Sequence, residues 1–151
     1  MILKIICLFL YCLFSLGFAW SNCGSDGLKI TSVFMKHCHN SPSPIKPDMC
    51  WPKKNANNTL FVVFTPYKNY TNLTVSVHTD LGVKFPLFDN GLVTCSRKPC
   101  SLIEGVAVKT HFSFMLNEKL PDSRPVKTYW YFMDDKEAIA GCFQITFMIS
   151  E

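Results

Sequence analysis

The residues that could perform acid, base or nucleophilic chemistry are few and scattered. Asp134 and Asp135 could form a carboxylate pair, and His78 and His111 could each act as a general base. Asp is also a frequent turn residue, because its side chain hydrogen-bonds nearby backbone amides. Both histidines fall on the polar side of an alternating segment, and no common hydrolase, zinc or phosphate-binding motif is present. We therefore expect a turn at the two Asp, surface histidines and no enzymatic activity; a small secreted esterase is an alternative without a motif behind it.

The first residues of the chain have the pattern of a secretory leader. Lys4 precedes an apolar run that ends at Phe18, and Ala19 supplies a small residue for cleavage. The run is too short for a comfortable membrane span, which needs about 20 apolar residues. We expect residues 1–19 to be a signal peptide and residues 20–151 to form one secreted domain, large enough at about 130 residues to bury a core.

Six cysteines remain once the leader is removed. An even number in a secreted chain predicts three disulfides, which could form in 15 pairings. The pairs that spacing favours are Cys95 with Cys100 around a short loop, Cys38 with Cys50 around a proline-rich loop, and Cys23 with Cys142.

A metal site at His37-Cys38-His39 is the alternative use of one of these cysteines. In a strand the two histidines would share one face while the cysteine lies on the other, so the three side chains would not converge. We expect a disulfide at Cys38, and neither a metal nor a cofactor.

The net charge bears on whether the protein binds nucleic acid, and the sequons bear on whether it is glycosylated. The net charge of +4 falls by one when Lys4 leaves, and no basic stripe is interleaved with aromatic residues, which excludes a nucleic-acid partner. Three N-x-Thr sequons begin at Asn57, Asn69 and Asn72. We expect glycosylation at one or more of them, because such sequons are used on the secretory route.

Short alternating segments separated by Pro, Gly, Asn and Asp dominate the rest of the chain. The predicted strands lie at Leu28–Met35, Leu60–Thr65, Leu73–His78, Val83–Leu87 and Val106–Leu116, followed by a hairpin within Thr128–Ile149. Seven or so short strands predict an all-β fold, a β-sandwich of a single domain.

One face of each predicted strand is unusually apolar. These residues are Leu60, Val62, Phe64, Val75, Val77, Val83, Phe85, Leu87, Phe112, Phe114, Leu116, Trp130, Phe132, Phe143, Ile145 and Phe147. Each one by itself is typical of an ordinary core. Taken together, they would line an apolar slot for a sterol or an acyl chain if the two sheets were splayed apart. We expect Tyr129 and Tyr131 on the opposite, outer face of the hairpin, with their hydroxyls in water.

Several segments occur in an order that resembles a known family. Cys23-Gly24 follows the leader, and "GVKFPLFDNGLVTCSRKPC", "NEKLP" and "WYFMDDKEAIAGC" come later in the chain. This order, with six cysteines, resembles the ML lipid-recognition family across the whole mature chain. It is most similar to the family's soluble Niemann–Pick type C sterol carriers, and is related to the group 2 mite allergens.

The resemblance implies an immunoglobulin-like two-sheet β-sandwich with a lipid cavity between the sheets. It also implies the cysteine pairing that spacing favours. The residues it implies as lipid-lining, together with their neighbours on the same strand faces, are Leu60, Val62, Phe64, Val83, Phe85, Leu87, Phe112, Phe114, Trp130, Phe132, Phe143 and Ile145. The sequence departs from the carriers after Leu120-Pro121, where Asp122 follows and the segment up to Trp130 is shorter, so no pocket residue is carried over there.

The function that the resemblance implies is lipid binding and transfer. We expect a secreted or lysosomal monomer that holds a sterol, phospholipid or fatty acid between the sheets and meets a membrane or a membrane-protein acceptor. The alternative on the same fold is a receptor accessory or innate-immune protein that recognises lipid and signals through a partner.

Overall fold

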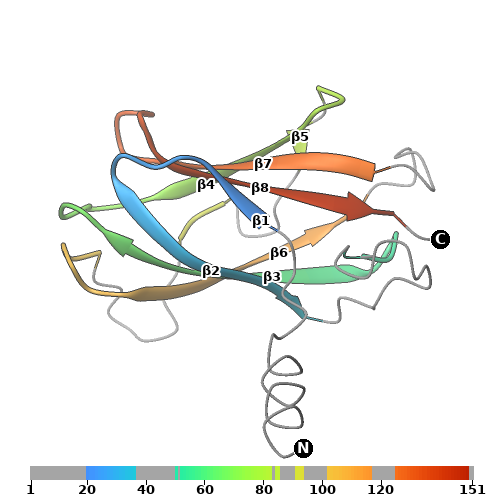
Figure 1. The fold of residues 1–151 in the computed structure, drawn as a ribbon, viewed down its shortest axis with the longest axis horizontal. Coiled ribbons are helices and arrows are strands. Elements are labelled where there is room, and N and C mark those ends of the chain that lie inside the picture. The colour runs from blue at the N-terminus through green and yellow to red at the C-terminus, as the bar shows by residue number, and fades with distance from the viewer. Residues whose placement is uncertain are drawn as a thin grey trace, which may run out of the picture.

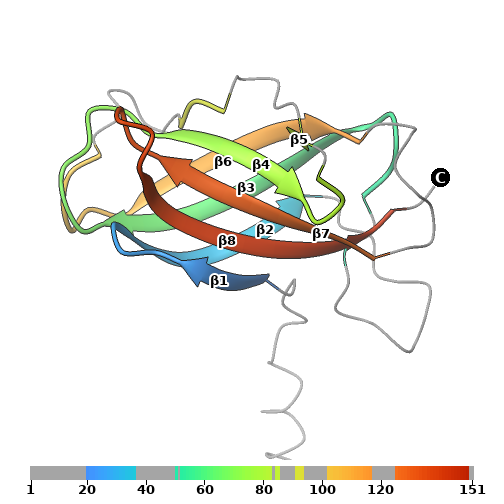
Figure 2. The same cartoon turned by 90° about the horizontal axis from the view of Figure 1, so that it is seen from above.

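Two antiparallel β-sheets face each other in this protein, as Figure 1 and Figure 2 show from two directions. The computed structural model describes residues 20–36, 50, 52–82, 84–85, 91–93, 102–116 and 125–149, with only the backbone described at 84–85. Eight strands lie within these residues, and the same residues contain no helix long and apolar enough to cross a membrane. The all-β fold class is confirmed.

The larger sheet has five strands in the order β1-β8-β7-β4-β5. Their bounds are Trp20–Gly24 for β1, Ile139–Met148 for β8, Pro125–Met133 for β7, Thr74–Thr79 for β4 and Lys84–Phe85 for β5. The hairpin predicted from the sequence forms its centre, since Trp130 of β7 pairs with Phe143 of β8 and with Val77 of β4.

The smaller sheet has three strands in the order β2-β3-β6. They run over Leu28–Lys36 for β2, Asn57–Pro66 for β3 and Val108–Met115 for β6. All three were predicted, with ends that differ by up to three residues. The Val83–Leu87 segment is different, because β5 contains only Lys84 and Phe85, while Val83 and Leu87 lie outside the described residues.

Strict alternation determines which side chains enter the space between the sheets. Along β3 the residues at even positions from Asn58 to Pro66 are buried, and those between them are exposed or half-buried. The same period of two holds along β6 and β7. Because successive strand residues point to opposite faces, each sheet directs one apolar face toward the other.

A strand that the sequence did not predict, β1, borders β8. Its residues show no alternation and most are exposed, so nothing in their pattern indicates a strand. Cys23 forms a disulfide with Cys142 of β8, with Cα atoms 5.1 Å apart, which confirms the predicted pairing of these two cysteines. Gly24 follows at a φ of +131°, a conformation that favours glycine, where the register shifts between Asn22 and Gly24.

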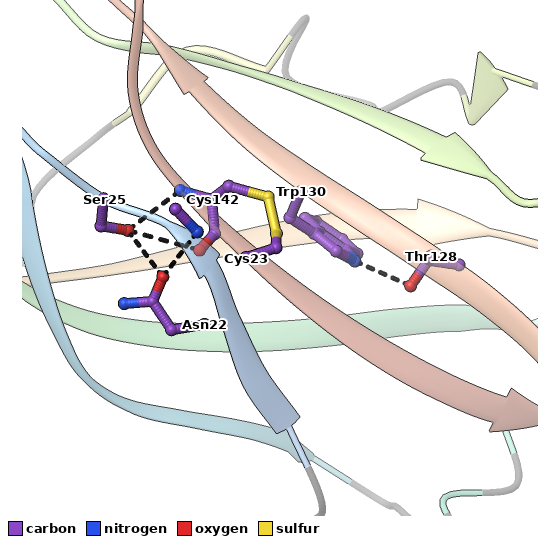
Figure 3. Close-up of a disulfide and its surroundings, with 7 residues drawn as sticks. Asn22, Cys23, Ser25, Thr128, Trp130 and Cys142 are labelled. Atoms are coloured by element: carbon purple, nitrogen blue, oxygen red, sulfur yellow. Dashed lines mark hydrogen bonds between the residues drawn. A yellow bond between two sulfur atoms is a disulfide. The ribbon is translucent and has the colours of Figure 1, made fainter.

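Ser25 fastens the end of β1 to the same place on β8 (Figure 3). Its hydroxyl accepts a hydrogen bond from the amide of Cys142 at 3.1 Å and lies 3.3 Å from the Cys142 carbonyl oxygen. The side chain of Asn22 accepts from the amide of Gly24 at 2.8 Å. The first strand is therefore held to the last by a covalent link and by polar contacts on either side of it.

The other two predicted disulfides involve residues beyond the described part of the chain. Cys50 is disulfide-bonded, but its predicted partner Cys38 is not among the described residues, nor are Cys95 and Cys100. Those two pairings stay predictions. The leader and the His37-Cys38-His39 segment also lie outside the described residues.

Candidate functional site

The inner faces of the two sheets bring together residues that the sequence singled out. Nine of the predicted lipid-lining residues have described side chains, and each is at most 1 % exposed. They are Leu60, Val62 and Phe64 on β3, Phe112 and Phe114 on β6, Trp130 and Phe132 on β7, and Phe143 and Ile145 on β8. Two strands of each sheet thus contribute these residues to one continuous apolar interior.

Aromatic rings from opposite sheets touch across this interior. Phe64 meets Phe132 at a centroid distance of 5.2 Å, and Phe114 meets Trp130 edge-on at 5.6 Å. Phe112 lies 6.0 Å from Trp130 and 6.2 Å from Phe132. These distances are those of favourable aromatic pairs. At this level of the sandwich the rings fill the space with one another, so a ligand here has to separate them or lie beyond them.

The indole of Trp130 is the best-anchored ring of the set. Its Nε1 donates to the hydroxyl of Thr128 at 3.1 Å (Figure 3). That hydroxyl in turn donates to the carbonyl oxygen of Ile145 at 3.1 Å. The ring stacks on Phe143 with planes 12° apart. A buried N–H normally finds a partner, and this chain of bonds fixes the ring plane along the interior.

Thr110 is a polar residue of the interior that the sequence analysis overlooked. It lies on the inner face of β6 opposite Val62, it is fully buried, and its hydroxyl has no hydrogen-bond partner. The neighbouring pairs are Phe64 with Val108 and Leu60 with Phe112. Phe132 of the opposite sheet reaches both Phe64 and Phe112, so this hydroxyl lies among aromatic rings.

The predicted lipid-lining residues of the Val83–Leu87 segment are only partly described. Phe85 lies on β5 with its backbone paired to Val77, but its side chain is outside the described residues, as are Val83 and Leu87. Their role in lining a cavity stays a prediction. The described part of the candidate site is therefore the set of buried residues named above.

Comparison with known proteins identifies the family of the chain. The family model for the ML domain matches residues 17–149. The chain belongs to the ML-domain family. This is a family of lipid-binding proteins, as the resemblance of the cysteine-containing segments implied.

Solved structures carry the same fold as this ML domain. A Niemann–Pick type C2 protein from the Japanese carpenter ant superposes with a TM-score of 0.66 at 20 % identity, covering 88 % of this chain and 100 % of that chain. The C-terminal domain of Wzt superposes with a TM-score of 0.55 at 11 % identity, covering 87 % of this chain and 78 % of that chain. No curated protein sequence matches the chain. At these identities the structures establish the fold.

The residues with candidate acid–base chemistry lie away from the interior of the ML domain. His78 is exposed on the outer face of the larger sheet, where its Nε2 lies 3.0 Å from the Ser76 hydroxyl, and His111 is on the outer face of the smaller sheet. The two histidines therefore cannot act on one substrate. Among the described residues, no three His, Cys, Asp or Glu side chains gather in a way that could hold a metal ion.

Asp134 is a turn residue of the β7–β8 hairpin. Its Oδ1 accepts hydrogen bonds from the amides of Ala138 at 3.0 Å and Lys136 at 2.9 Å, and these bonds lower the pKa of the carboxyl. Glu137 completes the turn at a φ of +60°. The expected turn at Asp134 and Asp135 is confirmed, and the hydrogen bonds explain why Asp stands there.

A surface pocket of about 250 Å³ lies beside this turn, away from the aromatic interior. Tyr70 lines it, with its hydroxyl 3.3 Å from the Gly27 carbonyl oxygen and the Lys68 ammonium 5.2 Å from its ring centroid. Burial, and then the nearby Asp134 carboxylate, raise the pKa of the Tyr70 phenol. The pocket is small, has Asp26, Lys68 and Asp134 in its lining, and lies outside the predicted lipid site.

The three sequon asparagines are all exposed. Asn57 begins β3, and Asn69 and Asn72 lie in the turn between β3 and β4. The Asn69 side chain accepts a hydrogen bond from the amide of Glu104 at 2.8 Å. Each side chain is open to an enzyme approaching from solvent, and their glycosylation stays a prediction.

Proposed function

We propose that this ML domain is a lipid carrier that holds the apolar body of a lipid between its two sheets and passes it on without a covalent step. Membership of the ML-domain family over residues 17–149, combined with inner faces that are apolar on both sheets, carries the proposal. The ligand class is a sterol, a phospholipid or a fatty acid. The acceptor is a membrane or a membrane protein.

The energetics of such binding depend on displacing ring–ring contacts. Burying on the order of 500 Å² of lipid surface contributes roughly 12 kcal/mol at ~25 cal/mol/Å². The loss of aromatic pairs, each worth about 0.5–1.5 kcal/mol, and the ordering of the ligand offset part of that gain. Rings such as Phe132 therefore tune affinity, because a lipid at this level has to displace their contacts with one another.

The secretory features complete the proposal. A leader over residues 1–19, the Cys23–Cys142 disulfide and three exposed sequons are all typical of a protein made on the secretory route. We propose that the mature protein works in the extracellular space or in the lysosomal lumen, as a monomer.

Mass spectrometry of lipids extracted from the purified protein tests the proposal directly. The protein is produced by secretion, folded with its disulfides, and then challenged with a fluorescent sterol and a fluorescent fatty acid in parallel. We expect at least one lipid to be recovered in a defined ratio and one probe to be displaced by it. Folded protein that carries no lipid and binds neither probe would refute the proposal.

The same preparation separates transfer from receptor recognition. Vesicle-to-vesicle transfer by the protein alone supports a carrier. Lipid binding without transfer, joined to stable capture by a receptor ectodomain, would instead support the receptor-accessory function.

A further inference from the structure

An aromatic row crosses the outer face of the smaller sheet. Phe34 of β2 lies opposite Phe61 of β3, which lies opposite His111 of β6. The Phe34 and Phe61 rings stack at 4.8 Å with planes 7° apart, and the Phe61 and His111 rings are 5.9 Å apart. Phe34 is 43 % exposed, and Met115 farther along β6 is 41 % exposed. Phe61 is half-buried between its neighbours. Contiguous apolar side chains on a surface mark an interaction site when polar residues border them.

Within the described residues of β2, β3 and β6, the charged side chains beside this row have a single sign. The non-buried residues of the three strands are Lys29, Thr31, Ser32, Phe34, Lys36, Asn57, Thr59, Phe61, Val63, Thr65, Lys109, His111, Ser113 and Met115. They include three exposed lysines and no carboxylate. We call Lys29, Phe34, Lys36, Phe61, Lys109 and Met115 the aromatic–lysine face.

The outer face of the larger sheet differs in its rings and in its number of lysines. Tyr129 and Tyr131 stack there at 6.4 Å, but both are half-buried, and their phenol groups are suited to water. Lys127 is the one lysine among the described side chains of its strands. The outer faces of the two sheets therefore differ in their exposed apolar rings and in their number of lysines, so one can serve as the control for the other.

We propose that the aromatic–lysine face docks on the surface of an anionic lipid bilayer. The rings of Phe34 and Phe61, and the Met115 side chain at the end of β6, can enter the interfacial region, while the lysines of β2 and β6 reach anionic headgroups with flexible stems. The charge complementarity is direct, because the described charged side chains of the face are all cations. This docking does not require a lipid inside the sandwich, although it would bring a carrier to its donor or acceptor membrane.

Asn57 lies at the edge of the same face, opposite Met115 in the register of β3 and β6. A glycan on Asn57 would stand beside the exposed methionine and compete with the bilayer for it. The experiment therefore uses the protein with and without Asn57→Gln, and we expect this substitution to strengthen docking when the wild type is glycosylated and to leave it unchanged otherwise.

Co-sedimentation with vesicles, without added cargo, measures the docking. Wild-type protein is mixed with phosphatidylcholine vesicles that do or do not contain phosphatidylserine, at low and high salt. We expect binding to the anionic vesicles, weakened by salt. The triple variant Lys29→Gln, Lys36→Gln, Lys109→Gln should bind on the order of 100-fold more weakly, since each lysine near an anionic surface contributes roughly a fivefold change.

The matched control is Lys127→Gln combined with Tyr131→Ala on the other sheet, which should leave vesicle binding unchanged. All these positions are on outer faces, so circular dichroism should show folded protein in every case. Phe34→Trp keeps an aromatic ring and adds a depth probe, whose fluorescence should shift to the blue on anionic vesicles, whereas that of Tyr129→Trp should not.

Equal loss of binding in the control and the triple variant would overturn the proposal. Failure of the wild-type protein to bind anionic vesicles would also overturn it. This outcome includes the case in which the face binds an acidic protein and not a bilayer. Vesicle binding and cargo binding are separate readouts, so failure of the carrier function would show as empty protein that still docks.

Discussion

The Phe64 ring of β3 and the Phe132 ring of β7 meet across the sandwich with their centroids 5.2 Å apart. Phe132 also lies within 6.2 Å of Phe112 on the smaller sheet and within 6.0 Å of Phe143 beside it. One side chain therefore joins rings of four strands. A lipid that enters at this level must displace the contact between Phe64 and Phe132. The pair therefore contributes both to the packing of the two sheets and to lipid affinity.

Phe132→Ala should lower the free energy of unfolding by about 3–5 kcal/mol, because it removes a fully buried ring and leaves a cavity among the rings around it. Urea denaturation measures this loss. Tyr129→Ala, three positions away on the outer face, should cost less than half as much. Equal losses in the two variants would contradict the assignment of Phe132 to the centre of the interior.

Phe85→Ala should lower lipid affinity more than it lowers stability if this ring lines the cavity. The reason is that a residue at a ligand wall contacts the ligand more than it contacts its own core. Fluorescent-probe titration and urea denaturation of the same variant give the two numbers. A stability loss of roughly 3–5 kcal/mol, with binding changed only through unfolding, would place Phe85 in the ordinary core.

Thr110→Val should raise the stability of the lipid-free protein by about 1–3 kcal/mol, because it removes a buried hydroxyl that has no hydrogen-bond partner while keeping the side-chain shape. Thermal unfolding of the delipidated protein measures the effect. Thr110→Ser retains the hydroxyl and loses a methyl group, so it should be less stable than wild type. Destabilisation by Thr110→Val would show that the hydroxyl does have a partner.

Replacing both Cys23 and Cys142 with Ser should lower stability by about 2–5 kcal/mol, since this disulfide spans 119 residues of sequence and constrains the unfolded chain. Hydrogen exchange should show the largest loss of protection at the amides of β1, where few side chains are buried. Protection of β3 should change only with global stability. Unchanged exchange in β1 would mean that its backbone pairing with β8 is sufficient.

Asp134→Asn should reduce stability at neutral pH and have less effect in acid. The amides of Ala138 and Lys136 favour the charged carboxylate and lower its pKa in the folded state. The stabilisation is thus present above the ordinary pKa of the unfolded carboxyl and is lost as pH falls through the lowered folded pKa. Urea denaturation over an acidic pH series checks this, with Asp135→Asn as the control. A difference from wild type that stays constant with pH would contradict it.

The sequence by itself determined the features that depend on local patterns: the faces of the strands, the hairpin turn and the pairing of two cysteines. Alternation placed Leu60, Val62 and Phe64 on one inner face, since a strand has a side-chain period of two wherever it pairs. Turn chemistry identified the hairpin at Asp134, and Cys23 and Cys142 indicated that the two ends of the mature chain meet. The cysteine-containing segments were specific enough to indicate the ML-domain family.

The tertiary structure decided what depends on distant partners. Strand β1 has no alternation of its own and is a strand because β8 pairs with it and the disulfide holds it there. The order β2-β3-β6 brings Phe34, Phe61 and His111 into one row, although they are distant in sequence. Likewise, only the distance between the sheets makes Phe64 touch Phe132 and leaves the Thr110 hydroxyl unpaired. Periodicity gives the side of a strand on which a residue lies, whereas its neighbours come from the sheet order and from the packing of one sheet on the other.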